Sequence, residues 1–165
     1  MNLLHIDTSI LDQGSVSRQL TAAIVERLKE LSPSTEIIYH DFVVNPLGHL
    51  AAAEFLAFRG EAPADLGARE AIALNANLLD EFLAADILVV GAPMYNFSLP
   101  SQLKAWLDRL AVGGKTFRYT EKGVEGLAGG KRVIVASTRG GLYGEHTPTA
   151  FLDHQENYLK GFFGF

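Results

Sequence analysis

The chain has 165 residues, a formal net charge of −5 and no cysteine. This length fits a single domain over residues 1–165, the absent cysteines exclude disulfides and thiolate metal sites, and an acidic chain without basic blocks is not expected to bind nucleic acid. No apolar run approaches the ~20 residues that span a bilayer, and the opening MNLLHIDTSI lacks the basic leader of a signal peptide, so we expect a cytoplasmic protein without a membrane partner.

Four short apolar segments predict β-strands. In chain order they are residues 3–6, 36–40, 86–90 and 132–136. Each is too short for a stable helix, and three of them are nearly continuous runs of Val, Ile and Leu, which is typical of parallel strands covered on both faces. The segment at residues 36–40 is more mixed, so we expect it nearer an edge of the sheet.

Three amphipathic segments between these strands predict helices. They are residues 17–31, 68–84 and 101–110. The apolar spacing places Leu20, Ile24, Leu28 and Leu31 on the buried face of the first helix. Ser101 is positioned to cap the third helix, and Arg109 falls on its exposed face. The alternation of strands and helices predicts an α/β fold with a doubly wound parallel sheet.

Two glycine-containing stretches and the end of the chain depart from this alternation. The stretches are residues 45–67 and 113–130, and excursions of this length are usually functional or interfacial. The chain ends in KGFFGF, which puts three phenylalanines in four residues and makes a poor solvated tail. We expect either that a last strand and helix are missing or that a partner covers this end.

The candidate ligand-binding residues directly follow the predicted strands. In open parallel sheets, ligands bind at the carboxyl ends of the strands, near the point where the strand order reverses. The segments in question are residues 7–17, 93–97 and 137–141. Three loops from distant parts of the sequence are therefore expected at one rim of the sheet.

The first loop carries hydroxyl groups beside a helix start. Ser9, Ser15 and Ser17 would lie next to backbone N–H groups that the first turn of the helix leaves free, and this combination of neutral donors suits a terminal phosphate. The alternative is that Ser15 or Ser17 merely caps the helix.

The other two loops carry flat apolar side chains and glycines. Met94, Tyr95 and Phe97 would form an apolar wall, or else ordinary packing, and Gly140-Gly141 lets backbone amides approach a ligand, or else only forms a turn. A ligand with a phosphate at one end and a planar ring at the other is a mononucleotide, and a flavin fits best. No G-x-G-x-x-G motif follows the first strand, which disfavours a dinucleotide.

Four stretches of the sequence carry a family resemblance. APMYNFSLPSQLKAWLDRL, TFRYTEKGVEGLAGGKRVIV, STRGG and DTSILDQGSVSRQL together resemble the FMN-dependent NADH-azoreductases, which are also NADH:quinone oxidoreductases. The resemblance implies a flavodoxin-like fold with strand order 2-1-3-4-5, a homodimer, and non-covalent FMN in two sites at the dimer interface. Relatives continue past the equivalent of Phe165 into a fifth strand and a final helix, so the resemblance implies that this chain is short at its C-terminus.

The resemblance also implies the residues of the site. Those that match the phosphate-binding loop are Ser9, Ser15, Val16 and Ser17. Those that match the loop along the isoalloxazine edge are Met94, Tyr95, Asn96 and Phe97. Those that match the second ring-binding loop are Thr138, Arg139, Gly140 and Gly141. Tyr119 and Phe162 match positions that wall the substrate side, in part from the other subunit.

The implied chemistry needs no catalytic side chain, because a flavin carries its own redox reactivity. We hypothesise ping-pong turnover, in which NADH or NADPH delivers hydride to flavin N5, and a quinone takes two electrons or an aromatic azo compound is cleaved to amines. The five histidines share no ligand spacing such as H-E-x-x-H, so no metal is expected. The alternative is a flavodoxin-type FMN electron carrier without small-molecule turnover, although the acidic excess is mild for a carrier's docking face.

Overall fold

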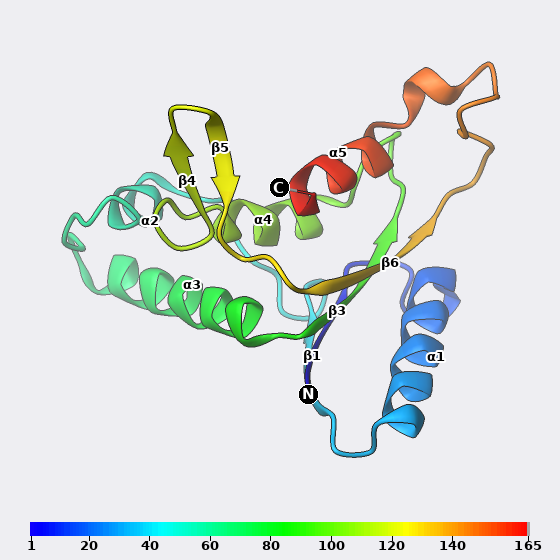
Figure 1. The fold of residues 1–165 in the computed structure, drawn as a ribbon, viewed down its shortest axis with the longest axis horizontal. Helices are drawn as coiled ribbons and strands as arrows, with labels where there is room; N and C mark the ends of the chain where they lie inside the picture. Colours follow the sequence, from blue (N-terminus) through cyan, green and yellow to red (C-terminus); the bar gives the residue numbers. More distant parts are fainter. Residues whose placement is uncertain (165) are drawn as a thin grey trace.

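The computed structural model describes residues 1–164. Phe165, the last of the three C-terminal phenylalanines, lies outside the described residues. The elements follow one another along the chain as Figure 1 shows. They are β1 (Asn2–Asp7), α1 (Val16–Leu31), β2 (Glu36–Asp41), α2 (Ala52–Ala57), α3 (Leu66–Ala84), β3 (Ile87–Pro93), α4 (Ser101–Leu110), β4 (Phe117–Thr120), β5 (Gly123–Gly126), β6 (Arg132–Thr138) and α5 (His154–Phe163), with short 3-10 helices at Asp12–Gly14 and Ala150–Leu152.

Four parallel strands form the central sheet in the order β2-β1-β3-β6. The pairing of β3 with β6 runs from Ile87 opposite Arg132 to Pro93 opposite Thr138. β1 and β3 are buried, while β2 lies at an edge and is largely exposed, so the predicted strands and the predicted edge are confirmed. The order matches the first four positions of the predicted 2-1-3-4-5 arrangement. The prediction that a fifth strand and a last helix are missing is not confirmed by the described residues.

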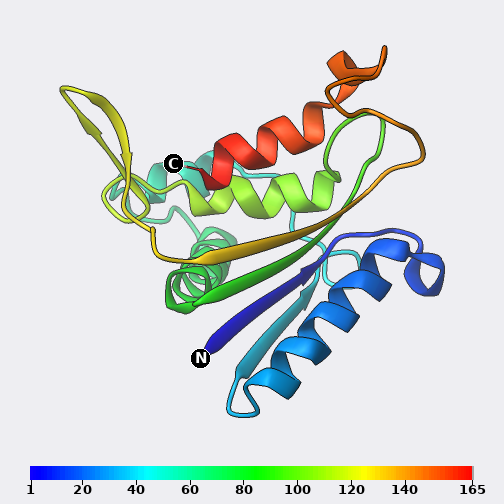
Figure 2. The same cartoon turned by 45° about the vertical axis from the view of Figure 1, so that its right-hand side comes forward.

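Helices cover both faces of this sheet (Figure 2). On one face, Leu3 and Val89 pack against Ile24 and Leu28 of α1. The other face carries a larger cluster that includes Trp106 of α4 and side chains of α3 and α5. Because successive side chains of a strand point to opposite faces, β1 and β3 contribute to both clusters.

The three predicted helices are confirmed as α1, α3 and α4, within two residues at each end. The predicted buried face of α1 is confirmed for Ile24 and Leu28, which pack against the sheet, and wrong for Leu20 and Leu31, which are exposed. The fully buried residues of this helix are Ser17 and Thr21. Pro100, and not Ser101, occupies the N-cap of α4, because its extended backbone leads directly into Ser101 as the first helical residue.

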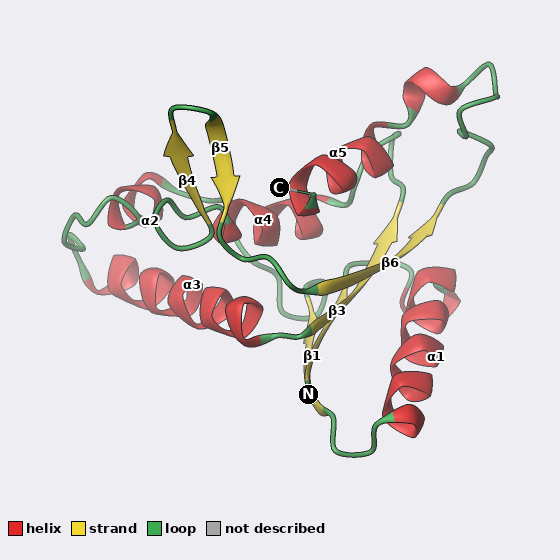
Figure 3. Cartoon of the chain, in the orientation of Figure 1, coloured by secondary structure: helices red, strands yellow, loops and turns green. Residues whose placement is uncertain are grey.

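The two irregular stretches contain further secondary structure. Residues 45–67 include the short helix α2, and residues 113–130 include an antiparallel hairpin of β4 and β5. The hairpin extends away from the central sheet (Figure 3). Each excursion therefore has an ordered element of its own, which its sequence did not indicate.

Candidate functional site

The loops that follow β1, β3 and β6 meet at one edge of the sheet. The Tyr95 Oη lies 3.3 Å from the Ser9 Oγ and accepts a hydrogen bond of 3.1 Å from the Ile10 backbone N–H. The Met94 backbone N–H donates to the Thr138 carbonyl oxygen at 2.7 Å. The predicted convergence of the three loops on one rim is therefore observed, with direct hydrogen bonds between them.

The loop before α1 presents hydroxyl groups and free backbone donors. Ser9, Ser15 and Ser17 are buried, and the Ser15 and Ser17 Oγ atoms lie 3.0 Å apart. Ser15 is the N-cap, because its Oγ accepts a hydrogen bond from the Arg18 backbone N–H. The backbone N–H groups of Val16 and Ser17 form no hydrogen bond with another described residue. The helix start thus keeps donors available for an anion, even though Ser15 also acts as the cap.

Arg18 connects this loop to the end of β2. Its Nε and Nη2 donate to the Ser9 carbonyl oxygen at 3.2 and 2.8 Å, and its Nη2 also donates to Asp41 Oδ1 at 2.9 Å. The hydrogen bonds from Arg18 lower the pKa of Asp41, although burial opposes the shift. Because the guanidinium is occupied by protein partners, the hydroxyls and amides are the donors that remain at this end of the rim.

The loop after β3 is a tight turn with an uncommon backbone. The backbone N–H groups of Tyr95 and Ser98 each donate to the other's carbonyl oxygen, at 2.9 and 3.0 Å. The two residues between them, Asn96 and Phe97, have φ of +48° and +69°. Residues other than glycine rarely adopt this conformation, and it persists only where surrounding contacts hold it. The turn leaves Phe97 41 % exposed at the rim, so burial in the core does not account for this aromatic side chain.

The loop after β6 is connected to α5 through Arg139. The guanidinium donates to Asp153 Oδ2 at 2.6 Å, to the Ser137 Oγ at 2.7 Å and to Glu156 Oε2 at 3.1 Å. Hydrogen bonds from Lys160 and Arg139 lower the pKa of Glu156. The Arg139 side chain therefore contacts the protein behind the loop, and Gly140 and Gly141 follow it as exposed backbone.

An open cavity of about 660 Å³ separates the start of α1 from the loop after β6. Its lining residues are Val16, Ser137, Thr138, Arg139, Gly141, Leu142, Tyr143, Gly144 and Thr147. Val16 belongs to the predicted phosphate-binding loop, and Thr138, Arg139 and Gly141 belong to a predicted ring-binding loop. The structure thus places residues of the two kinds of loop around one shared space.

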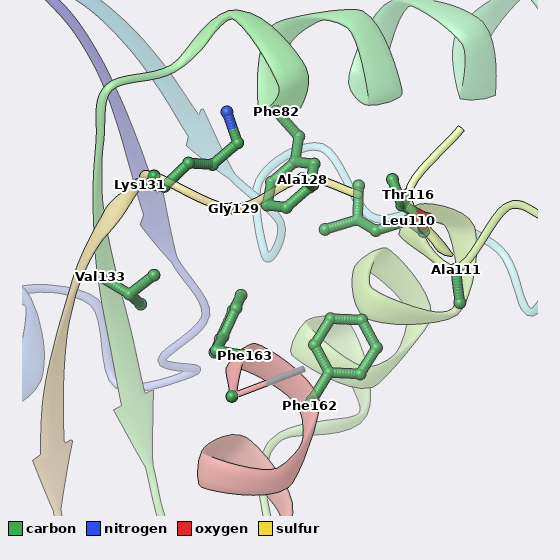
Figure 4. A pocket seen from close by; sticks show the side chains of 12 residues that line it. Phe82, Leu110, Ala111, Thr116, Ala128, Gly129, Lys131, Val133, Phe162 and Phe163 are labelled. Atoms are coloured by element: carbon green, nitrogen blue, oxygen red, sulfur yellow. The ribbon is translucent and has the colours of Figure 1, made fainter. Parts of the chain in front are cut away.

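Tyr119 and Phe162 lie away from this rim. Tyr119 is 80 % exposed on β4, where its ring meets the Phe117 ring edge to face. Phe162 lines an apolar cavity of about 240 Å³ together with Val133 and other side chains (Figure 4). Val133 is near the start of β6 and Thr138 is at its end, about 16 Å further on at ~3.3 Å per residue. Within one chain, the two predicted substrate residues are therefore separate from the predicted FMN residues.

A buried carboxylate that the sequence analysis did not single out lies beneath the first loop. Asp7 accepts hydrogen bonds from the Thr21 Oγ1 at 2.8 Å and from the Tyr39 Oη at 3.1 Å. Burial, together with Asp7 and Asp41, raises the pKa of Tyr39 to about 12. A Cβ at position 91 would lie 2.7 Å from Asp7 Oδ1, so only glycine fits there. The signal in the sequence is an aspartate that directly ends an apolar strand.

A second buried polar cluster joins α2, α3 and α4. Glu54 Oε1 accepts hydrogen bonds from the Arg109 Nη2 at 2.8 Å and from the Asn75 Nδ2 at 3.1 Å, and the Arg109 Nε donates to Asn75 Oδ1 at 2.7 Å. Arg109 is only 3 % exposed, so the prediction that it lies on an exposed helix face is wrong. Its partner Glu54 lies in the irregular stretch far away in sequence, and helical periodicity alone does not reveal such a pair.

Two other kinds of site have no candidate within the part of the chain that the structure describes. Within residues 1–164, no group of three or more His, Cys, Asp or Glu side chains is arranged to hold a metal ion. In the same part of the chain, no helix is both long enough and apolar enough to cross a membrane.

Comparisons with known proteins agree with this geometry. A family model described as a flavodoxin-like fold matches residues 1–165. The chain is 60 % identical to an FMN-dependent NADH:quinone oxidoreductase of Sinorhizobium fredii and 56 % identical to FMN-dependent NADH:quinone oxidoreductase 2 of Bradyrhizobium diazoefficiens; each match covers all of this chain and 80 % and 81 % of the relative. The crystal structure of an FMN-dependent NADH-azoreductase from Bacillus anthracis in complex with FMN superimposes with a TM-score of 0.88 at 25 % identity, over all of this chain and 81 % of that one.

Proposed function

We propose that this chain, which belongs to the family of flavodoxin-like FMN-dependent NADH:quinone oxidoreductases, reduces quinones by two electrons and cleaves aromatic azo compounds to amines, with NADH or NADPH as electron donor. It is an oxidoreductase with FMN as its cofactor. The alternative of an electron carrier without small-molecule turnover is not favoured, because the similar proteins are named as oxidoreductases and azoreductases.

The observation that carries the proposed site is the direct connection of the three loops at one rim. Hydroxyls and free amides lie at the start of α1, and the Tyr95 hydroxyl connects this loop to the turn after β3. The Met94–Thr138 hydrogen bond then connects that turn to the loop after β6. Neutral donors at a helix start fit a phosphate, and exposed aromatic and glycine positions fit a flat ring. The residues present are therefore compatible with FMN.

When bound, FMN supplies the hydride and two-electron chemistry of the reaction. The chain's own contribution is to bind and orient it: Ser9, Ser15 and Ser17, with the amides of the first turn of α1, hold the phosphate. Residues 94–97 and 138–141 would hold the ring. The backbone N–H groups of Asn96, Phe97, Gly140 and Gly141, which form no hydrogen bond with another described residue, would stabilise negative charge there. The open cavity at the rim, where the Tyr143 ring contacts the Phe97 ring, would serve both substrates. We therefore propose that donor and acceptor bind in turn, which gives ping-pong kinetics.

We also propose that the chain acts as a homodimer. Tyr119 and Phe162 lie away from the rim of their own chain, so a substrate wall that includes them requires a second copy. Large exposed apolar side chains support this: Tyr119 is 80 %, Leu142 82 % and Phe151 74 % exposed. Sedimentation should give twice the mass of one chain, and a monomer that is fully active would contradict the proposal. A cytoplasmic location remains a prediction of the sequence.

The test begins with the FMN content of the purified protein, followed by anaerobic reduction with NADH and with NADPH. Steady-state rates with menadione and with methyl red should then give parallel lines in double-reciprocal plots. Intersecting lines would contradict ping-pong turnover, and a flavin that is reduced but never passes electrons to either acceptor would support the carrier instead. A colourless protein that takes up no FMN would contradict the whole proposal.

A further inference from the structure

We infer that the first turn of α5 sets the spacing of the two ring-binding loops, with Asp153 and Gln155 as positioning residues. The inference rests on the proposed FMN site, and it names side chains that hold the loops from behind. α5 begins beside the loop that leaves β3 (Figure 2). The polar atoms of this first turn are hydrogen-bonded to both loops, as the following contacts show.

Gln155 bridges the ends of β3 and β6. Its side chain is fully buried, its Nε2 donates to the Ala92 carbonyl oxygen at 3.0 Å, and its Oε1 accepts a hydrogen bond of 3.0 Å from the Ser137 Oγ. Ala92 lies two residues before Met94, and Ser137 directly precedes Thr138. One buried amide therefore bonds to both strand ends from which the loops depart and reinforces the direct pairing of Ala92 with Ser137 in the sheet. Both polar ends of this amide would be costly to leave unpaired.

Asp153 holds the second loop and caps α5 with the same carboxylate. Oδ1 accepts hydrogen bonds from the backbone N–H groups of Gln155 and Glu156, at 3.1 and 2.8 Å, while Oδ2 accepts the 2.6 Å bond from Arg139. The neighbouring His154 backbone N–H donates to the Phe97 carbonyl oxygen at 3.0 Å. Thus three successive residues, 153–155, connect the turn after β3 with the loop after β6.

Glu156 provides a matched control for Asp153, because both carboxylates accept hydrogen bonds from the Arg139 guanidinium. Glu156 also accepts a hydrogen bond from Arg139, but its side chain is 44 % exposed and it is shared with Lys160, whereas the Asp153 side chain is 8 % exposed. Exposed ion pairs contribute little, while a buried charge-assisted hydrogen bond contributes more. Loss of charge at the two positions should therefore have unequal effects if Asp153 positions the loop.

The experiment compares Asp153→Asn with Glu156→Gln, using the dissociation constants of FMN and of riboflavin. Asn keeps an oxygen for the helix cap but loses the carboxylate that faces Arg139. Because the loops contact the ring and riboflavin lacks the phosphate, Asp153→Asn should weaken both ligands by the same factor, about tenfold. It should also shift the visible absorption of the bound flavin. Glu156→Gln should change either constant by less than about twofold.

A stability control separates positioning from general loosening of the fold. Leu78→Ala removes a buried side chain of α3 away from the rim, and its Tm can be compared with that of Asp153→Asn and of Gln155→Leu. The inference is overturned if Leu78→Ala, at an equal loss of Tm, weakens riboflavin binding as much as Asp153→Asn does. It is also overturned if Asp153→Asn leaves both dissociation constants unchanged or weakens FMN binding alone. In either case the proposed function stands. If the unmodified protein binds neither flavin, both fall.

Discussion

Two groups of buried polar residues differ in whether the donors and acceptors around them all have partners within the protein. Around Glu54, a carboxylate, an amide and a guanidinium bond to one another, and the Arg109 Nη1 also donates to the Ala105 carbonyl oxygen at 2.7 Å. At the start of α1, the Ser15 and Ser17 hydroxyls bond to each other, while the neighbouring amides of Val16 and Ser17 keep free N–H groups beside an open cavity.

This difference distinguishes a set of polar residues that stabilises the fold from a set that has donors free to bind a ligand. A buried charge is tolerated only when it is paired and hydrogen-bonded, which is the state of Glu54 and Arg109. The free amides at the start of α1, in contrast, bond to water or to an anion that replaces the water. Changes to the first group should therefore affect stability alone, and changes to the second should affect flavin binding alone.

The largest expected effect is on stability, from Arg109→Met. The variant leaves the buried Glu54 carboxylate without its cation, which should lower the free energy of unfolding of the flavin-free protein by about 3 kcal/mol. The FMN dissociation constant of the folded variant should remain within about twofold of the original. Urea denaturation and flavin titration measure the two quantities. A folded variant with strongly weakened FMN binding would contradict the separation of the two groups.

The next effect is on binding, from Val16→Asp. Val16 is exposed at the first helical position, where a carboxylate favours the helix start but repels a phosphate. FMN affinity should fall about a hundredfold, since two like charges a few Å apart near a protein surface cost several kcal/mol. Riboflavin affinity should change little. Val16→Asn is the uncharged control, and equal losses for FMN and riboflavin would place the phosphate elsewhere.

A smaller effect follows from pH, because the group around Glu54 titrates and the serine hydroxyls do not. Burial raises the pKa of Glu54, but hydrogen bonds from Ala51, Asn75 and Arg109 outweigh it and hold the pKa below 4.5. A carboxylate with a lowered pKa in the folded state stabilises the fold above its unfolded pKa and loses this contribution as the pH falls through the folded pKa.

The decline in unfolding free energy below pH 4.5 should therefore be shallower in Glu54→Gln than in the original chain. Denaturation curves at successive pH values measure it. Identical slopes in the two proteins would mean that Glu54 keeps the same pKa when the chain unfolds.

The smallest effect concerns the connection between loops, through Tyr95→Phe. The change keeps the ring and removes the hydroxyl that contacts Ser9 and Ile10. FMN affinity should fall about threefold, because one neutral hydrogen bond contributes about 1 kcal/mol or less, and riboflavin affinity should fall less. Titrations of Tyr95→Phe with FMN and with riboflavin measure this, and the same titrations of Ser9→Ala serve as the reference. An equal loss for both would mean that the hydroxyl acts on the ring and not on the phosphate loop.

The meeting of the three loops at one rim was predictable because strand ends are local features. Ser9, Tyr95 and Thr138 each follow an apolar run, and parallel strands bring such positions to one edge. The bonds between these loops were not predictable, since they depend on how side chains orient after folding. Leu20 was misassigned because helical periodicity gives a repeating stripe but not the angle at which α1 lies on the sheet.

The sequence by itself determined the alternation of strands and helices, the buried strands and the three loops, because apolar periodicity and the residues that interrupt it act over a few positions. Only the tertiary structure decided that Arg109 is buried against Glu54, that Gln155 bridges Ala92 and Ser137, and that Tyr119 and Phe162 lie away from the rim. These are contacts between segments far apart along the chain, and their formation depends on the packing of whole elements, which no local pattern encodes.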